Sequence, residues 1–181
     1  MFFRKFTAKD GRGVTLRSPR WEDLDDMLDF INSLVEEDAP IAKDSRVTRE
    51  EEVDWLANCL AGLEKRGLVV IVAEVEGSMV GQVFLSPRAG RLKHVGNLGI
   101  SVKKGYRNIG IGYELLREAE PHAEKLGIEI IYLEVFDSNK NAIHLYSKLG
   151  YREVGRIPKG ALYNGHYVDS VSMVKEIIKS G

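Results

Sequence analysis

The stretch from residue 98 to residue 112, LGISVKKGYRNIGIG, constrains the fold more than any other part of the chain. Ile100 and Val102 are β-branched residues suited to a strand, and an apolar pattern with helical spacing begins directly after the turn. Gly110 and Gly112 therefore lie in the first turn of a helix, where each costs about 1 kcal/mol relative to alanine. Close approach of a phosphate to the free N–H groups of a helix N-terminus would explain both glycines. The stretch predicts a strand, a turn and a helix that bind a pyrophosphate-bearing cofactor.

Two familiar phosphate-binding motifs fail on the residues of this stretch. Gly105 and Gly110 have the spacing of the Walker pattern, but Ile111 stands where that pattern has its lysine. Gly112 occupies the position of its magnesium-binding Ser or Thr. The dinucleotide fingerprint GxGxxG would begin at Gly110 but meets Leu115 in place of its third glycine. The sequence therefore disfavours Walker-type nucleotide binding and hydride-transfer chemistry.

Size, charge and cysteine content limit the remaining classes of function. A chain of 181 residues suits one domain with a sizeable core, so we expect a single domain over residues 1–181. The net charge of -1 gives no bulk attraction to nucleic acid or to an anionic membrane, and we expect neither as a partner. Cys59 is the only cysteine, and no histidine has metal-ligand spacing with it, so we expect no disulfide and no metal. Without a recognisable signal peptide or spanning run, we predict a cytoplasmic protein.

Hydrophobic periodicity and turn signals predict seven strands and four helices. The first 13 residues, which are polar after two phenylalanines, are expected to form a partly ordered leader. Pro121 falls inside the third helix and predicts a kink or an early helix end there. The strand that begins at residue 128 is an almost continuous apolar run, as expected of a strand covered on both faces. The predicted strands are 14–17, 68–76, 79–87, 92–102, 128–135, 151–157 and 166–174, and the predicted helices are 21–34, 49–65, 111–126 and 138–149.

Two segments of the chain resemble conserved blocks of a known family. Residues 107–112, RNIGIG, resemble the (Arg/Gln)-x-x-Gly-x-(Gly/Ala) signature of the GNAT superfamily of acetyl-CoA-dependent N-acetyltransferases. Residues 133–151, LEVFDSNKNAIHLYSKLGY, resemble the second conserved block of that family and are the more specific match. The segments 16–31 and 162–175 are similar to its first strand and helix and to its closing hairpin. The resemblance implies one N-acetyltransferase domain of the α/β class, with a mixed, largely antiparallel twisted sheet flanked by helices and splayed between the fourth and fifth predicted strands.

The same resemblance implies how acetyl-CoA would be held as the cosubstrate. The strand at residues 100–102 is expected to pair through its backbone with the pantetheine amides, while residues 107–112 wrap the pyrophosphate. Asn139 aligns with an asparagine that contacts the cofactor arm, and Tyr146 aligns with a tyrosine near the sulfur. The implied cofactor-binding residues are Ile100, Ser101, Val102, Arg107, Asn108, Ile109, Gly110, Ile111, Gly112, Asn139 and Tyr146.

Acetyl transfer to an amine requires a neutral nucleophile, stabilisation of an oxyanion and a proton for the departing thiolate. Tyr146, with an ordinary pKa near ~10, could protonate a thiolate whose thiol titrates near ~8.5. The alternative is an amphipathic tyrosine packed among the apolar residues of its helix. Glu134 is the candidate base, because an acidic residue in an apolar strand is costly unless it is hydrogen-bonded or used. The alternative for Glu134 is a solvent-facing or structural role.

The sequence leaves the acceptor amine open. Deprotonating a lysine-like amine at neutral pH costs about 4–5 kcal/mol, whereas an α-amine costs only about 1 kcal/mol. Protein N-termini and small amines such as polyamines, amino sugars or antibiotics all remain candidates. The acidic residues of the loop after the first helix would suit a cationic amine, although a solvated loop is the simpler interpretation; they are Glu36, Glu37, Asp38 and Asp44.

Two further questions concern the class and the assembly of the protein. A binding module that keeps the fold and senses acyl-CoA without catalysis is the alternative to an enzyme. The resemblance is also compatible with a homodimer, because relatives are commonly dimeric.

Overall fold

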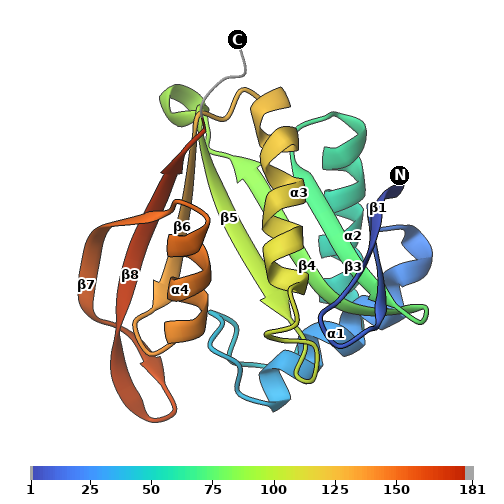
Figure 1. Cartoon of the computed structure of the whole chain (residues 1–181), viewed down its shortest axis with the longest axis horizontal. Helices are drawn as coiled ribbons and strands as arrows, with labels where there is room; N and C mark the ends of the chain where they lie inside the picture. Colours follow the sequence, from blue (N-terminus) through green and yellow to red (C-terminus); the bar gives the residue numbers. More distant parts are fainter. Residues whose placement is uncertain (1, 178–181) are drawn as a thin grey trace.

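A computed structural model describes residues 2–177 and shows one eight-stranded sheet with helices on both faces (Figure 1). The strand order is β1-β2-β3-β4-β5-β6-β8-β7. Every neighbouring pair is antiparallel except β5 and β6, which run parallel. The strands are β1 (Phe2–Thr7), β2 (Gly13–Arg17), β3 (Val69–Val75), β4 (Ser78–Pro87), β5 (Val95–Val102), β6 (Ile130–Phe136), β7 (Arg152–Tyr163) and β8 (His166–Glu176), and the helices are α1 (Leu24–Glu36), α2 (Arg49–Glu64), α3 (Ile111–Lys125) and α4 (Lys140–Lys148).

The sheet divides the hydrophobic core into two parts. Helices α3 and α4 cover one face, and their apolar side chains pack with those of β2 to β6 and β8 in the larger part. Helices α1 and α2 cover the other face, where Phe30 and Leu56 pack against Val72 and Met79 of the sheet. Because successive strand residues point to opposite faces, β3 contributes Ile71 and Ala73 to the larger part and Val72 to the smaller one. No helix within residues 2–177 is long and apolar enough to cross a membrane.

The sheet opens between β5 and β6, as the resemblance implied. The two strands pair only over Val95–Asn97 and Ile130–Tyr132. Beyond Asn97, β5 continues to pair with β4 on one edge but has no strand partner on its other edge among the described residues. The predicted mixed, largely antiparallel sheet splayed at this point is therefore confirmed.

The sequence-based prediction was wrong for the first 13 residues. Phe2–Thr7 forms β1, which pairs with β2 and packs Phe3 and Phe6 against the larger part of the core. A register shift between Phe2 and Arg4 disturbs the two-residue alternation that identifies a strand. The positive charge of Arg4, which obscures the strand in the sequence, is compensated by ion pairs with Glu114 and Glu118 of α3.

Two other boundaries differ from the predictions, whereas α3 agrees with its predicted range. Helix α3 continues past Pro121 to Lys125, so of the kink and the early end that this proline predicted, the early end does not occur. Residues Gly90–Leu92 form a 3-10 turn, and β5 begins only at Val95. Strand β7 extends to Tyr163, beyond the predicted end at residue 157, and a register shift between Ile157 and Ala161 accommodates the intervening Pro158 and Gly160.

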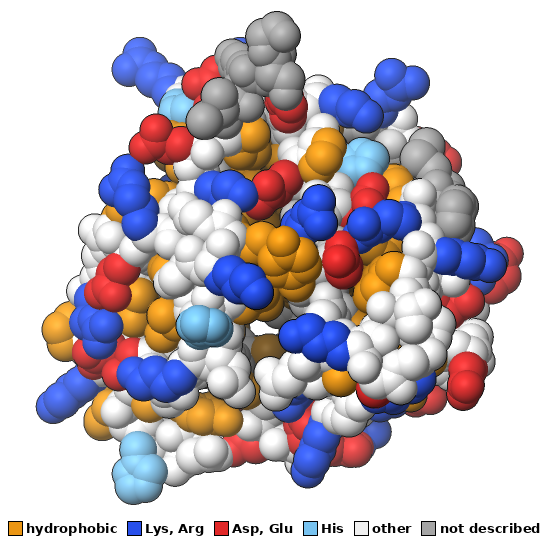
Figure 2. Space-filling view, viewed as in Figure 1, with side chains coloured by type: hydrophobic (Ala, Val, Ile, Leu, Met, Phe, Trp, Pro, Cys, Tyr) orange, Lys and Arg blue, Asp and Glu red, His pale blue; other side chains and the backbone are white. Residues whose placement is uncertain are grey.

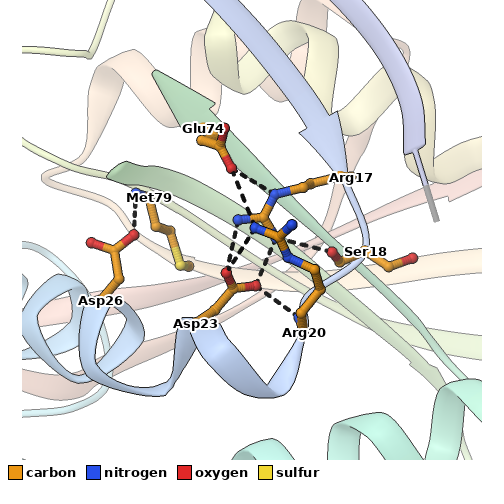
Figure 3. Close-up of polar contacts among 7 residues, drawn as sticks. All are labelled: Arg17, Ser18, Arg20, Asp23, Asp26, Glu74 and Met79. Atoms are coloured by element: carbon orange, nitrogen blue, oxygen red, sulfur yellow. Dashed lines mark hydrogen bonds and ion pairs between the residues drawn. The ribbon is translucent and has the colours of Figure 1, made fainter. Parts of the chain in front are cut away.

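A buried ion network joins α1 to the sheet (Figure 3). Arg17 of β2 donates two hydrogen bonds to Asp23, at 2.6 and 2.8 Å, and one to Glu74 of β3, at 2.7 Å. Burial by itself raises the pKa of Asp23, but hydrogen bonds from Arg17 and from the Arg20 N–H outweigh burial and hold this pKa below its usual value. Asp26 accepts a hydrogen bond from the Met79 N–H, which adds a contact between α1 and β4. The network therefore fixes the start of α1 on the sheet.

Candidate active site

A cavity of about 810 Å³ lies between α4, the start of α3 and the unpaired end of β5. Figure 2 shows this face hollowed there, with lysine or arginine side chains at the rim of the hollow. The cavity brings together all but one of the residues that the sequence implied for cofactor binding, namely Ile100, Ser101, Val102, Arg107, Asn108, Ile109, Gly110, Gly112, Asn139 and Tyr146. The exception is Ile111, whose side chain is buried in the core behind the cavity.

The free edge of β5 forms one wall of the cavity. Residues 100–102 lie beyond the last β5–β6 pair, and all three line the cavity. Backbone N–H and C=O groups on an unpaired strand edge can bond to the amides of an extended ligand, as in strand addition. This wall therefore suits a chain of amide groups such as pantetheine.

The two glycines at the start of α3 have different structural causes. Gly110 is the N-cap of α3 with φ of 100°, a conformation that strains any other residue, and a Cβ added there would meet nothing within 4 Å. A Cβ at Gly112 would lie 3.3 Å from Cδ2 of Leu145, so this glycine lets α4 approach α3 closely. No described side chain caps the helix. Gly110 thus leaves the positive end of α3 open to the cavity, where an anion is stabilised.

Arg107 lies at the cavity, and its guanidinium already contacts two groups of the protein. Its Nε donates a hydrogen bond of 2.7 Å to the Val102 carbonyl, and its Nη2 forms an ion pair with Glu37 from the loop after α1. The side chain of Glu37 is only 13% exposed. The interpretation of this acidic loop as merely solvated was therefore wrong for Glu37. The loop also contributes Ala39, Pro40 and Ile41 to the cavity wall.

Tyr146 of α4 lies in the cavity wall with its side chain almost fully enclosed. The residue is 7% exposed, its ring packs against that of Tyr151 at 5.8 Å between centroids, and burial raises the pKa of Tyr146 to about 12. The hydroxyl therefore stays protonated at neutral pH. Full proton transfer to a thiolate of ordinary pKa would cost about 5 kcal/mol, so a hydrogen bond to the sulfur is the contribution that this environment favours.

Asn139 has a structural contact in addition to its place in the cavity. It is the N-cap of α4, where its Oδ1 accepts a hydrogen bond of 3.2 Å from the Ala142 N–H. This bond occupies the side-chain oxygen, and the amide nitrogen of Asn139 is the group left for a ligand.

Glu134 lies outside the cavity, on the opposite face of the sheet. Its neighbours Leu133 and Val135 point into the core beneath α3 and α4, so Glu134 points away from them and is exposed. Its carboxylate accepts a hydrogen bond of 2.6 Å from the Tyr132 hydroxyl, which lies 3.0 Å from Ser172 Oγ. Strand β6 is therefore not buried on both faces as predicted. Glu134 can act on an amine only if the amine approaches from this second face.

Several residues of the two faces were not identified from the sequence. Tyr132 lies on the same face of the sheet as Glu134, and the Arg88 guanidinium lies 4.5 Å from the ring centroid of Tyr132. The two-residue period of β6 places Tyr132 beside Glu134 and could have identified it. The additional side chains that line the cavity include Phe6, Thr7, Lys9, Tyr113, His144 and Lys148. Those of β1 and its turn were missed because a leader was expected there. Among residues 2–177, no cluster of three His, Cys, Asp or Glu side chains is arranged to hold a metal ion.

Comparisons with known proteins agree with this geometry. The model of the acetyltransferase (GNAT) family matches residues 28–151. An L-amino acid N-acetyltransferase of Escherichia coli is 33% identical over 114 residues, which cover 62% of this chain and 70% of that protein. An N-alpha-acetyltransferase of Sulfurisphaera tokodaii is 31% identical over 159 residues, covering 81% of this chain and 85% of the relative.

A solved structure shows the same fold. A GNAT superfamily phosphinothricin acetyltransferase from Sinorhizobium meliloti, in complex with acetyl-CoA, matches with a TM-score of 0.79 at 20% identity and covers 91% of this chain and 88% of that chain. The family match extends over more than half of the sequence, from α1 through α4. The chain therefore belongs to the GNAT family and is an acetyl-CoA-dependent N-acetyltransferase.

Proposed function

We propose that the protein transfers the acetyl group of acetyl-CoA to an α-amino group, either of an amino acid or of a peptide N-terminus. The amine attacks the thioester directly while both substrates are bound. The observation that carries the proposal is the position of the cavity, which joins the free edge of β5, the open end of α3 and Tyr146 at the gap between β5 and β6.

Three parts of the cavity support binding of acetyl-CoA in one orientation. The N–H groups at the start of α3 suit the pyrophosphate, and the free edge of β5 suits the pantetheine amides. Tyr146 then lies farther along α4, where the thioester would reach the gap in the sheet. A phosphinothricin acetyltransferase of the same fold was solved in complex with acetyl-CoA, which supports acetyl-CoA as the ligand.

The proposed reaction needs removal of a proton from the amine and stabilisation of the departing coenzyme A thiolate. The amine nitrogen forms a bond to the thioester carbon, the carbon–sulfur bond breaks, and coenzyme A leaves as the thiolate. Tyr146 donates a hydrogen bond to the sulfur as its negative charge develops. Glu134, on the second face, accepts the amine proton directly or through water.

The α-amine is favoured because it needs the least help from a base. Glu134 is exposed on its strand and already accepts a hydrogen bond from Tyr132. An α-amine needs only about 1 kcal/mol of deprotonation at neutral pH, compared with about 4–5 kcal/mol for a lysine-like amine. Two relatives bear names that refer to amino acids or to N-alpha acetylation, which agrees with this choice.

A panel of amines tests the proposal through release of the coenzyme A thiol. The panel contains free L-amino acids, short peptides with free N-termini, the same peptides with blocked N-termini and an internal lysine, and spermidine. We expect kcat/KM for the best α-amine to exceed that for the blocked peptides and spermidine by at least about tenfold. Faster turnover of spermidine or of a lysine side chain would contradict the assignment. Tight acetyl-CoA binding without release by any amine would favour a sensor.

A further inference from the structure

The hairpin formed by β1 and β2 holds the loop that leads into α3. The Lys9 N–H donates a hydrogen bond of 3.0 Å to the Ile109 carbonyl, and Arg12 Nη2 donates one of 2.6 Å to the Gly105 carbonyl. The Arg12 guanidinium also lies 4.2 Å from the ring centroid of Tyr106. The turn of the hairpin is therefore attached to both ends of the segment that faces the cavity.

The same hairpin supplies one wall of the cavity. Phe6, Thr7 and Lys9 line it beside the loop at residues 107–110 and the first turn of α3. The family match begins only at residue 28, so this wall belongs to the part of the chain outside the matched segment. The wall therefore brings a lysine to the same cavity as the open start of α3.

The positive charge of Lys9, unlike that of the hairpin's arginines, is not compensated by an ion pair within the described residues. Arg4 pairs with Glu114 and Glu118, and Arg12 pairs with Asp10. Lys9 has no carboxylate partner among residues 2–177 and is exposed at the cavity.

The single carboxylate of the cavity lining is also compensated. Glu114 lines the cavity, but Arg4 pairs with it from β1. Lys148 of α4 lines the cavity as a further cation. The positive charge of Lys9 thus adds to that of the helix end and favours an anionic ligand.

We propose that Lys9 binds a phosphate group of acetyl-CoA, so that the N-terminal hairpin forms a third wall of the cofactor site together with β5 and α4. This inference rests on the proposed function, because it requires acetyl-CoA to bind with its phosphates at the start of α3. The hairpin holds the loop through the Lys9 N–H and the Arg12 guanidinium, and the Lys9 side chain would add a charge-assisted hydrogen bond to the phosphate that an apolar residue could not make.

Calorimetric titration with coenzyme A tests Lys9 directly. We expect Lys9→Met to weaken binding about tenfold, while Lys9→Arg retains affinity within about threefold. Lys5→Met is the matched control, since Lys5 is an exposed lysine of the same hairpin that does not line the cavity, and it should bind as the wild type does. Thermal melting of each variant reports whether the fold is retained.

Two truncated ligands separate a phosphate contact from a structural effect. S-acetylpantetheine lacks every phosphate, so its kcat/KM should be the same for the wild type and Lys9→Met. With 3′-dephospho-coenzyme A, loss of the Lys9→Met penalty assigns the contact to the 3′-phosphate, and persistence assigns it to the pyrophosphate. Both results support the proposal.

An unchanged affinity of Lys9→Met for coenzyme A, or an equal loss with S-acetylpantetheine, would overturn the role of Lys9. The proposed function fails in a different way. A wild type that binds coenzyme A but acetylates no amine would refute the acetyl transfer while leaving the Lys9 result intact. A wild type that does not bind coenzyme A would refute both.

Discussion

At the β5–β6 gap, the two faces of the sheet offer different kinds of chemical group to a ligand. On the α3 and α4 face, three parts of the cavity offer backbone groups to a ligand: the free edge of β5, the loop before α3 and the uncapped helix start. On the other face, the candidate groups are side chains on a strand, with Glu134 bonded to Tyr132 and Arg88 above the Tyr132 ring. A site made of backbone depends on glycines and strand ends, whereas a site made of side chains can change with single substitutions.

This difference suggests separate roles for the two faces, with the cofactor bound on the α3 and α4 face and the acceptor amine on the Glu134 face. Cofactor binding would be insensitive to most substitutions other than those at Gly110, where φ is 100°, and at Lys9. The acceptor face would determine which amine reacts, because its side chains are exposed to the incoming substrate. Each of the following variants should alter one property and leave the other in place.

The largest expected effect is on the structure that carries the second face. Asp23→Asn leaves Arg17 buried without its bidentate partner, and we expect the free energy of unfolding to fall by about 3 kcal/mol at neutral pH. Glu22→Gln, an exposed neighbour, is the control. Because the pKa of Asp23 is lowered by folding, its stabilisation is complete above the unfolded pKa and is lost as pH falls through the folded pKa. Urea unfolding from pH 7 to pH 3 should therefore show a constant difference in stability between the wild type and Asp23→Asn near neutral pH, and a difference that shrinks only in acid.

Tyr146→Phe should give the largest effect on chemistry. Loss of the hydroxyl removes a hydrogen bond to the leaving sulfur, so kcat should fall about a hundredfold while the dissociation constant of coenzyme A changes less than about threefold. The raised pKa of Tyr146 keeps the hydroxyl protonated, so the wild-type rate should show no loss attributable to it up to about pH 10. Stopped-flow turnover and calorimetry measure the two quantities. An unchanged kcat would remove Tyr146 from the reaction.

Features set by the backbone were also easier to predict from the sequence than features set by contacts between distant side chains. The glycines, the strand at residues 100–102 and the helix after them could be recognised because backbone requirements leave a residue-type signal in the sequence. Strand β1 could not, since a register shift breaks its alternation and Arg4 is compensated only by residues of α3, about 110 positions later. The environment of Glu134 could be predicted only in part: Tyr132 lies two residues away on the same strand, whereas Ser172, which contacts the Tyr132 hydroxyl, comes from β8 and is brought there by sheet pairing.

Gly110→Ala tests the backbone character of the cofactor face. The αL conformation costs a residue with a Cβ about 1–2 kcal/mol, and relaxation of the loop would move the N–H groups of α3, so coenzyme A should bind about tenfold more weakly. Gly165→Ala is a matched control, because Gly165 in the β7–β8 turn has φ of 72° and equally open surroundings. Both variants should lose similar stability in thermal melting. A similar loss of affinity in Gly165→Ala would show that strain alone explains the effect.

Glu134→Gln should give the smallest effect, and its pH dependence carries the information. For an α-amine near its own pKa, removal of the base should lower kcat/KM about fivefold at pH 7, with recovery above about pH 9, where the amine is already neutral. Tyr132→Phe removes the hydrogen-bond donor to Glu134 without removing the carboxylate, and it should leave the shape of the profile intact. The profile is measured with the best α-amine of the panel at saturating acetyl-CoA. If Glu134→Gln is as impaired at pH 9.5 as at pH 7, Glu134 does not act as the base, and its exposed position on β6 would then serve to bind the acceptor.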